Sequence, residues 1–218
     1  MNIILLAPPL SGKGTQASLL KNKLNLVHIS IGDMLRKASQ NNDDLAKKIN
    51  EVLSSGALVS DDLAIELLEK ALIENKESNG FVFDGFPRTI PQAEKLDELF
   101  NDLNINLDYV FLLNVDVYTL EKRITGRRVC MKCNRVYNIY NSDMMPKVEN
   151  ICDNCESSLI IRSDDNLDSF KVRYQEYLDK TYPIIEYYKN KGNLIEIDAT
   201  KNVDEVFENI LSIMKRDV

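Results

Sequence analysis

Every cysteine of this sequence falls within one short window, as Cys130-x2-Cys133 and, eighteen residues later, Cys152-x2-Cys155. Two Cys-x2-Cys pairs at this spacing are typical of a zinc ribbon, in which four thiolates bind one tetrahedral ion. Disulfide bonds are the alternative, and a reducing cytosolic compartment disfavours them. No coordination position is left open, so we expect a structural zinc ion. The only histidine, His28, is far away in sequence, and we expect it to be a satisfied structural residue.

A second candidate for chemistry is the segment Ser11-Gly12-Lys13-Gly14-Thr15, which lies between an apolar run and a helical pattern. In a strand–loop–helix of this kind, backbone N–H groups and the helix N-terminus bind phosphate. The usual phosphate loop has glycine, any four residues, and then Gly-Lys-Ser/Thr. Here Ala7 takes the first position, and Gly14 stands between Lys13 and Thr15. The segment predicts a nucleotide-phosphate site, with a plain polar turn as the alternative.

A third segment, Asp84-Gly85-Phe86-Pro87-Arg88, directly follows the apolar run Phe81–Phe83. An aspartate at the carboxyl end of a parallel strand would lie beside the phosphate loop and could hold Mg²⁺ through water. Arg88 would then be placed to bind a phosphate. A turn with an N-capping aspartate is the alternative, but its combination with Lys13 favours nucleotide binding.

Arginine is scarce in this chain compared with lysine, although it is the residue best suited to bidentate recognition of phosphate. The positions of the arginines are therefore informative, and they are Arg36, Arg88, Arg123, Arg127, Arg128, Arg135, Arg162, Arg173 and Arg216.

Composition limits the classes of protein that these residues can belong to. The chain has 218 residues, of which 28% are charged and 44% hydrophobic, as in an ordinary globular protein. The net charge of −7 argues against nonspecific binding of nucleic acid. No apolar stretch approaches the roughly 20 residues of a membrane span, and Met1–Ala7 lacks the basic leader of a signal peptide. We expect a cytoplasmic protein.

Apolar runs that alternate with helical patterns must position these groups. The runs predict strands over 3–7, 27–30, 81–83, 109–115 and 194–197. Helical spacing predicts helices over 15–24, 33–40, 43–55, 61–75, 90–103, 117–125, 167–190 and 203–214, with Ser60 as a helix cap. This alternation indicates a parallel sheet covered by helices on both faces. Residues 126–165 interrupt it, because they are polar and contain the cysteines.

Four motifs occur in an order that is shared with one family: Ser30-Ile31-Gly32-Asp33-Met34-Leu35-Arg36, Asp84–Arg88 with Thr89 and Gln92, Gly126-Arg127-Arg128, and Arg162-x-Asp164-Asp165. With them the chain resembles the adenylate kinases from end to end, specifically the long-lid form with a cysteine-bound zinc. The resemblance implies an α/β, P-loop nucleoside monophosphate kinase fold, with a five-stranded parallel sheet flanked by helices. It also implies a core of residues 1–29, 60–125 and 166–218, an AMP-binding insert at 30–59 and a zinc-bound lid at 126–165.

The activity that this resemblance implies is reversible, Mg-dependent phosphoryl transfer between ATP and AMP to give two ADP, in adenine nucleotide homeostasis. The residues implied in catalysis are Lys13, Arg88, Arg127, Arg162 and Arg173. Those implied in binding ATP are Ser11, Gly12, Lys13, Gly14, Thr15, Arg123, Arg127, Val136, Tyr137 and Lys201. Those implied in binding AMP are Ile31, Arg36, Gly56, Ala57, Leu58, Val59, Gly85, Arg88, Gln92, Arg162 and Arg173. Asp84 would hold magnesium through water, and the cysteines would hold one zinc ion. A monomer is expected that binds ATP, AMP and ADP, but neither nucleic acid nor membrane.

Three residues depart from the family pattern: Ala7 and Leu10 replace glycines of the phosphate loop, and Ile31 replaces a threonine beside the AMP base. We expect Ala7 and Leu10 to be tolerated, and Leu10 can turn its side chain away from the phosphates if its φ is negative. A kinase for another nucleoside monophosphate or one using GTP is an alternative. So is a noncatalytic nucleotide-binding or zinc-ribbon module, which would not need the full set of arginines.

Overall fold

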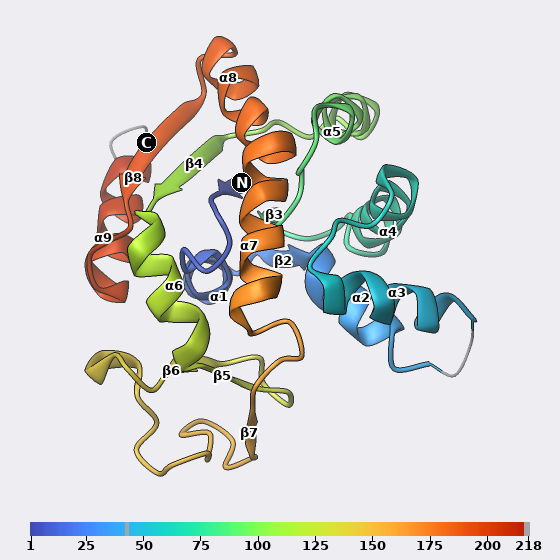
Figure 1. The fold of residues 1–218 in the computed structure, drawn as a ribbon. Coiled ribbons are helices and arrows are strands. Elements are labelled where there is room, and N and C mark those ends of the chain that lie inside the picture. The colour runs from blue at the N-terminus through green and yellow to red at the C-terminus, as the bar shows by residue number, and fades with distance from the viewer. Residues whose placement is uncertain (42–43, 216–218) are drawn as a thin grey trace.

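The structure is a computed structural model of the full chain and describes residues 1–41 and 44–215. Its central sheet has five parallel strands, in the order β2 (Val27–Ser30), β3 (Phe81–Asp84), β1 (Asn2–Leu6), β4 (Tyr109–Asn114) and β8 (Leu194–Asp198) (Figure 1). The α/β fold with a five-stranded parallel sheet is therefore confirmed. Because the strands are parallel, their carboxyl ends meet at one edge of the sheet, where a ligand can lie.

Alternate residues of the strands face two separate hydrophobic cores, as expected for a sheet that is buried on both sides. In β1, Ile3 and Leu5 face one core, while Ile4 and Leu6 face the other. The first core is closed by α1 (Lys13–Leu24) and α9 (Val203–Met214). The second is closed by α4 (Asp61–Glu74), α5 (Ile90–Asp102) and α8 (Tyr182–Asn190). Ser60 caps α4 as predicted, because its hydroxyl accepts a hydrogen bond from Leu63 N.

Two short helices, α2 (Ile31–Ala38) and α3 (Asp44–Ser55), follow β2 and lie beyond the end of that strand (Figure 1). Their apolar residues Leu35 and Ile49 join the same core as α4. Asp43, the predicted first residue of α3, lies outside the described residues, as does Arg216, which is expected at the surface.

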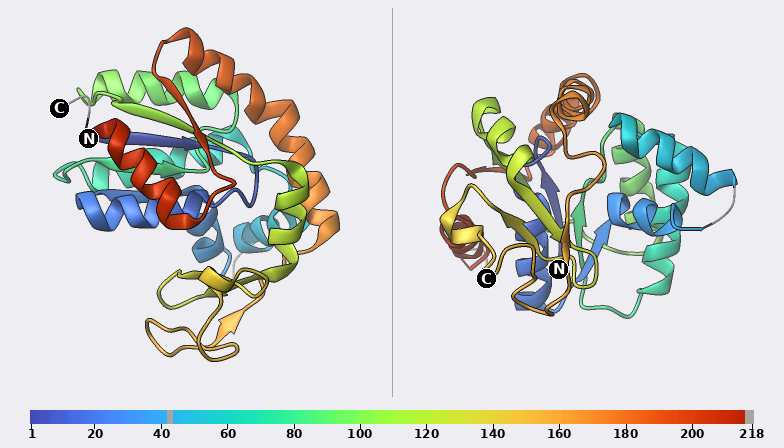
Figure 2. Two further views of the ribbon diagram at one scale, coloured as in Figure 1. Left: turned by 90° about the vertical axis from the view of Figure 1, so that its left-hand side faces the viewer. Right: turned by 60° about the horizontal axis from the view of Figure 1, so that its bottom comes forward.

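A second, antiparallel sheet of three strands is built from the segment that interrupts the alternating pattern. Its order is β6 (Val136–Asn138), β5 (Arg127–Cys130) and β7 (Leu159–Ile160), and the 3₁₀ turn η1 (Ser142–Met144) follows β6. This unit projects from the ends of α6 (Val117–Gly126) and α7 (Leu167–Glu176), as Figure 1 and the left view of Figure 2 show. Its position relative to the sheet therefore depends on these two helices.

The predicted helical segment 167–190 is helical throughout, but it is not α-helical throughout. The segment contains α7, a π-helical turn η2 (Tyr177–Thr181) and then α8. Pro183 lies in the first turn of α8 and has no N–H to donate to the preceding turn. The π-helical turn is where the helix accommodates that missing donor. The other predicted elements are found with ends shifted by up to two residues. Within the described residues, no helix is both long and apolar enough to cross a bilayer.

Candidate functional site

The phosphate loop connects β1 to α1 and keeps the backbone of a glycine-rich loop. Gly12 has φ = 99° at the N-cap of α1. Leu10 has φ = 67°, so the condition of a negative φ is not met. It therefore adopts the left-handed conformation that a glycine would take, while its side chain packs near the cluster of Leu120, Ile124 and Phe170. The apolar side chain therefore packs toward α6 (Val117–Gly126) and α7 (Leu167–Glu176), the helices that lead to the projecting unit.

Two polar groups of this loop, the half-buried Lys13 ammonium and the buried Ser11 hydroxyl, could contact an anion. Lys13 Nζ donates to the carbonyl oxygens of Ala7, at 3.0 Å, and Pro8, at 3.2 Å. The Ser11 hydroxyl is buried and has no hydrogen-bond partner among the described residues. Burial lowers the pKa of Lys13 to about 8; Asp84 opposes this shift, and the positive charges of Arg88, Arg173 and Arg127 add to it. A bound polyphosphate would satisfy all of these groups.

Asp84 ends β3 beside the phosphate loop, as predicted. A methyl group on Gly14 would lie only 3.2 Å from Asp84 Oδ2, so the carboxylate faces the start of α1. Burial opposes ionisation of Asp84, but His28, Lys13 and Arg88 outweigh it and lower the pKa of the carboxyl. An ionised carboxylate directed at a phosphate loop fits a hydrated magnesium ion.

His28, which we expected to be a satisfied structural residue, has Asp84 as its polar neighbour. Its buried Nε2 lies 3.5 Å from Asp84 Oδ2, a long contact, and has no hydrogen-bond partner within the described part of the chain. The histidine also lines the larger cavity described below. The position of His28 near the carboxyl end of a predicted strand is the sequence signal for this placement. In the structure that strand, β2, pairs with β3, which carries Asp84.

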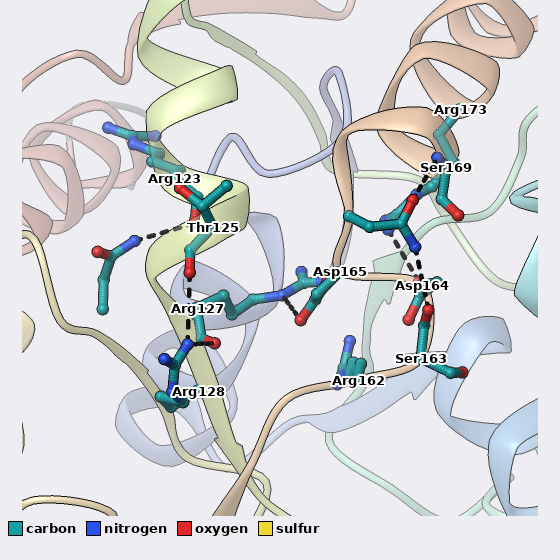
Figure 3. Close-up of polar contacts among 12 residues, drawn as sticks. Arg123, Thr125, Arg127, Arg128, Arg162, Ser163, Asp164, Asp165, Ser169 and Arg173 are labelled. Carbon is teal, nitrogen blue, oxygen red and sulfur yellow. Dashed lines mark hydrogen bonds and ion pairs between the residues drawn. The ribbon is translucent and has the colours of Figure 1, made fainter.

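Four arginines point into the same region, and each is held by an aspartate. Arg127 binds Asp165 through both Nε, at 2.9 Å, and Nη2. Arg173 Nη1 lies 2.8 Å from Asp164 Oδ2. Figure 3 shows Arg127 reaching from the end of α6 toward Asp165, and Arg173 descending from α7 toward Asp164.

The remaining two, Arg36 and Arg162, share Asp33. Arg36 Nη2 lies 2.6 Å from Asp33 Oδ1, and Arg162 Nη2 lies 3.5 Å from the same oxygen. Burial lowers the pKa values of Arg162 and Arg173 to about 10, and neighbouring arginines add to the shift. The Nε of Arg162 is buried without a partner among the described residues. Such a concentration of buried positive charge is suited to binding several phosphate groups.

These groups surround a cavity of about 600 Å³ at the carboxyl edge of the sheet. Its lining contains many of the residues predicted for ATP and for catalysis: Ser11, Gly12, Lys13, Gly14, Thr15, Asp84, Arg88, Arg123, Arg127, Val136, Tyr137, Arg162, Arg173 and Lys201. Arg123 donates to the backbone oxygens of Ser11 and Ala199. The cavity thus brings residues from the sheet, α6, α7 and the projecting unit to one place.

A second, smaller cavity of about 60 Å³ adjoins the first. It is lined by the other residues predicted for AMP, namely Ile31, Arg36, Gly56, Ala57, Leu58, Val59, Gly85, Arg88, Gln92 and Arg173. Arg36, Arg88 and Arg173 line both cavities. Two nucleotides placed one in each cavity would therefore have their phosphates directed at the same three arginines.

Arg88 is fixed from several directions at the junction of the cavities. Its Nε donates to Gly85 O at 2.8 Å, and Thr181 of the π-helical turn donates to its carbonyl oxygen at 3.0 Å. Gly85 has φ = 75°, and a methyl group on it would lie 2.7 Å from Arg88 Nη2. Glycine is therefore needed here both for its backbone conformation and for the close approach of the guanidinium.

The four predicted zinc ligands come together in the projecting unit. Cys130 Sγ lies 3.3 Å from Cys155 Sγ, and Cys133 Sγ lies 3.5 Å from Cys152 Sγ. All four sulfur atoms lie within 4.8 Å of one another, and the thiols are free. Sulfurs about 2.3 Å from one tetrahedral ion are about 3.8 Å apart, whereas a disulfide needs about 2.05 Å. The cluster fits zinc and not disulfides.

Tyr137, which was predicted to bind ATP, has a buried side chain that also reaches this cluster. Its hydroxyl donates to Cys152 Sγ at 3.4 Å and accepts from Asp153 N at 2.7 Å. A hydrogen bond of this kind orients a metal ligand. Tyr137 thus lies between the cysteine cluster and the larger cavity.

Comparison with known proteins gives one consistent result. A model of the family described as "Adenylate kinase" matches residues 5–193. The curated adenylate kinase of Thermosipho africanus is 42% identical to the chain over 216 residues, which are 99% of the chain and 100% of that protein. The adenylate kinase of Thermoanaerobacter sp. is 44% identical and covers 96% of each chain, and that of Clostridium tetani is 44% identical and covers 98% of each.

Proposed function

The chain belongs to the adenylate kinase family and is a nucleoside monophosphate kinase, and on that premise we propose how its own residues carry out the reaction. The observation that carries the proposal is the convergence of Lys13 and Arg88, Arg127, Arg162 and Arg173 on one cavity beside a second, smaller one. Nothing in the matches favours a kinase for another nucleotide or a noncatalytic module.

We propose that ATP occupies the larger cavity. The N–H groups of Ser11–Thr15 and the Lys13 ammonium would bind its phosphates, taking the place of the loop carbonyls that now accept from Lys13. Arg123, Val136, Tyr137 and Lys201 would lie around its base and ribose.

AMP would occupy the smaller cavity. Arg36 and Arg88 would bind its phosphate, and Gln92 would contact the edge of its base. Ile31 and the segment Gly56–Val59 would cover the base. Because the phosphates of both nucleotides would meet at Arg88 and Arg173, the cavities set up an in-line transfer from one to the other.

The chemical step would need no general base from the protein. The step needs the negative charge on the transferring phosphoryl group to be stabilised. Buried arginines stabilise this charge well because water is excluded. Arg127, Arg162 and Arg173 would leave their aspartates to bind that group. The aspartates keep the guanidinium groups near their working positions in the free protein.

Two metal ions belong to the proposal. Adenylate kinases use Mg·ATP, and Asp84 would hold the hydrated magnesium, which supplies positive charge to the phosphates. One zinc ion would be bound by Cys130, Cys133, Cys152 and Cys155, and would stabilise a lid too small to bury a core of its own.

Closure over the substrates would involve two segments that flank a rigid core of residues 1–29, 60–125 and 166–218. These are an AMP-binding insert of residues 30–59 and a lid of residues 126–165. Their movement would exclude water, which otherwise competes with AMP as acceptor. The protein would act as a cytoplasmic monomer on ATP, AMP and ADP, without binding nucleic acid or membrane.

The test is a coupled assay of the purified protein with magnesium, pairing ATP or GTP with AMP, GMP, CMP or UMP. We expect kcat/KM to be highest for ATP with AMP. A higher value for any other pair would refute the proposed specificity, and ATP binding without any transfer would refute the proposed catalysis.

A further inference from the structure

The side-chain amide of Gln92 is held at both ends by partners whose hydrogen-bonding polarity cannot change. Its Oε1 accepts a hydrogen bond from the backbone N–H of Arg88 at 2.7 Å. Its Nε2 donates to Asp61 Oδ1 at 2.7 Å. A backbone N–H can only donate and an ionised carboxylate can only accept, so these two partners define which end of the amide is oxygen.

Gln92 is buried, with a relative exposure of 3%, so its amide cannot exchange these partners for water. Rotating the amide by 180° would place Oε1 against the carboxylate of Asp61 and Nε2 against the N–H of Arg88. Both hydrogen bonds would be replaced by contacts between like groups, which is costly in a buried position. The orientation seen in the structure is therefore the one that Asp61 and Arg88 enforce.

Asp61 can hold the Gln92 amide in this orientation from outside both cavities. It is the first residue of α4, is only half-buried, and does not line either cavity. Its second oxygen, Oδ2, accepts a hydrogen bond from Thr89 Oγ1 at 3.1 Å. Thr89 in turn caps α5, the helix that carries Gln92. The Asp61 carboxylate thus contacts Gln92 from outside the cavities. It is itself held by Thr89, the N-cap residue of the helix that carries Gln92.

We propose that Asp61 is a specificity-determining positioning residue, which makes the site select a 6-aminopurine monophosphate over a 6-oxopurine monophosphate. With its outer hydrogen bonds occupied, Gln92 presents one free acceptor lone pair and one free N–H to the smaller cavity. Adenine complements this pair, because it carries an N6–H donor next to the N1 acceptor. Hypoxanthine carries the reverse, an O6 acceptor next to an N1–H donor, and would require the rotated amide. The inference rests on the proposed contact between Gln92 and the base.

The experiment measures kcat/KM for AMP and for IMP, which differ in this donor–acceptor pair, in the wild type and in Asp61→Asn. The new amide can donate to a rotated Gln92 as well as accept from an unrotated one, so one of the two mismatches that oppose rotation is removed. We expect the AMP/IMP ratio to fall at least about tenfold, since one buried hydrogen-bond mismatch has been removed. The change should appear mainly as a lower KM for IMP, with kcat for AMP nearly unchanged. Discrimination should not vanish, because Arg88 N–H still favours the original orientation.

The matched control is Asp62→Asn, which removes the same charge from the next, exposed residue in the first turn of α4. It should leave the AMP/IMP ratio unchanged. Dissociation constants for AMP and IMP from calorimetry provide a readout that does not depend on turnover. Should Asp61→Asn fold poorly, Asp61→Ala frees the amide in the same way and should also lower the ratio.

Gln92→Ala separates this inference from the proposed function. If Gln92→Ala collapses the AMP/IMP ratio and Asp61→Asn lowers it, the inference is supported. If Gln92→Ala collapses the ratio but folded Asp61→Asn and Asp61→Ala leave it intact, the role of Asp61 is refuted and the contact of Gln92 with the base stands. If Gln92→Ala leaves the ratio intact, that contact and the inference both fail. An equal effect of Asp62→Asn would show that the loss of negative charge alone lowers the ratio, and would refute the positioning role of Asp61.

Discussion

The Asp33 carboxylate on α2 lies 3.5 Å from Arg162, which reaches it from the segment that connects the cysteine-bearing unit to α7. The same oxygen also accepts from Arg36. One carboxylate therefore contacts two arginines, Arg36 and Arg162, which are 126 positions apart in the chain. A phosphate has the same charge sign and more acceptor oxygens, so it can replace Asp33 between them.

The low pKa of Lys13 predicts that binding of ATP depends on pH. In the free protein this pKa is about 8, compared with an ordinary value of 10.5. Above pH 8 the free enzyme therefore loses the ammonium, and ATP must restore it. We expect affinity for ATP to weaken between about pH 7.5 and 10, and binding at pH 8 to take up about half a proton. Calorimetry in buffers of different ionisation enthalpy measures that uptake.

Lys13→Arg provides the control, because an arginine keeps its charge over this range. Its affinity should be nearly independent of pH, and a wild-type curve that is equally flat would contradict the prediction. The same pKa also makes the stability of the fold depend on pH. Because the folded pKa lies below the unfolded one, the buried charge costs stability up to pH 8. That cost is relieved as the pH rises toward 10.5.

The conformation of Leu10 predicts an inverted order of stability for two substitutions. At most positions glycine is less stable than alanine by about 0.5–1 kcal/mol. At φ = 67° a Cβ costs about 1–2 kcal/mol, and both variants lose the same packing near Phe170. We therefore expect Leu10→Gly to be more stable than Leu10→Ala by about 0.5–1 kcal/mol, measured by urea unfolding.

The comparison pair is Glu121→Gly and Glu121→Ala, at an exposed position within α6. There alanine should be the more stable of the two by about the usual amount. If Leu10 shows the same order as Glu121, its left-handed conformation is wrong.

The cysteine cluster predicts about one zinc ion per chain, the stoichiometry of a four-thiolate site. Cys130→Ser combined with Cys133→Ser should abolish stoichiometric zinc and lower the Tm, because the projecting unit has few other buried contacts. Turnover at 25 °C should be lowered much less than thermal stability. Metal analysis and calorimetry measure the two effects.

Met131 offers the control within the same knuckle, since it is exposed and is not a ligand. Met131→Ser should retain zinc and the wild-type Tm. Absence of zinc from the wild-type protein, together with paired cysteines, would contradict the assignment.

The strands and the cysteine cluster could be predicted from sequence because their signals are local. Apolar runs mark the strands, and Cys-x2-Cys spacing marks each knuckle. The phosphate loop, Asp84 and the arginines could be assigned because motif order links them to one family. All of the residues predicted to bind nucleotide line one of two adjoining cavities.

Features that depend on contacts between distant segments could not be predicted. The positive φ of Leu10 is stabilised by the path of the loop and by packing against α6 and α7. The sequence shows Asp164 and Asp165 as part of a motif, but not that each binds a different arginine. The carboxylate of Asp61 meets Gln92 only because α4 and α5 pack together, and the two residues are 31 positions apart.

The central claim is that phosphoryl transfer depends on arginines that face the larger cavity, and adjacent residues test it. Arg127 lines that cavity, whereas Arg128 does not line it and, among the residues that the structure describes, donates to the backbone oxygens of Thr125 and Arg127. The measurement is kcat/KM for ADP formation from Mg·ATP and AMP in Arg127→Ala and Arg128→Ala. We predict a loss of at least about a hundredfold for Arg127→Ala, because a charged contact to the transferring group is removed, and less than about threefold for Arg128→Ala. Near wild-type turnover in a folded Arg127→Ala, or an equal loss in both variants, would contradict the account.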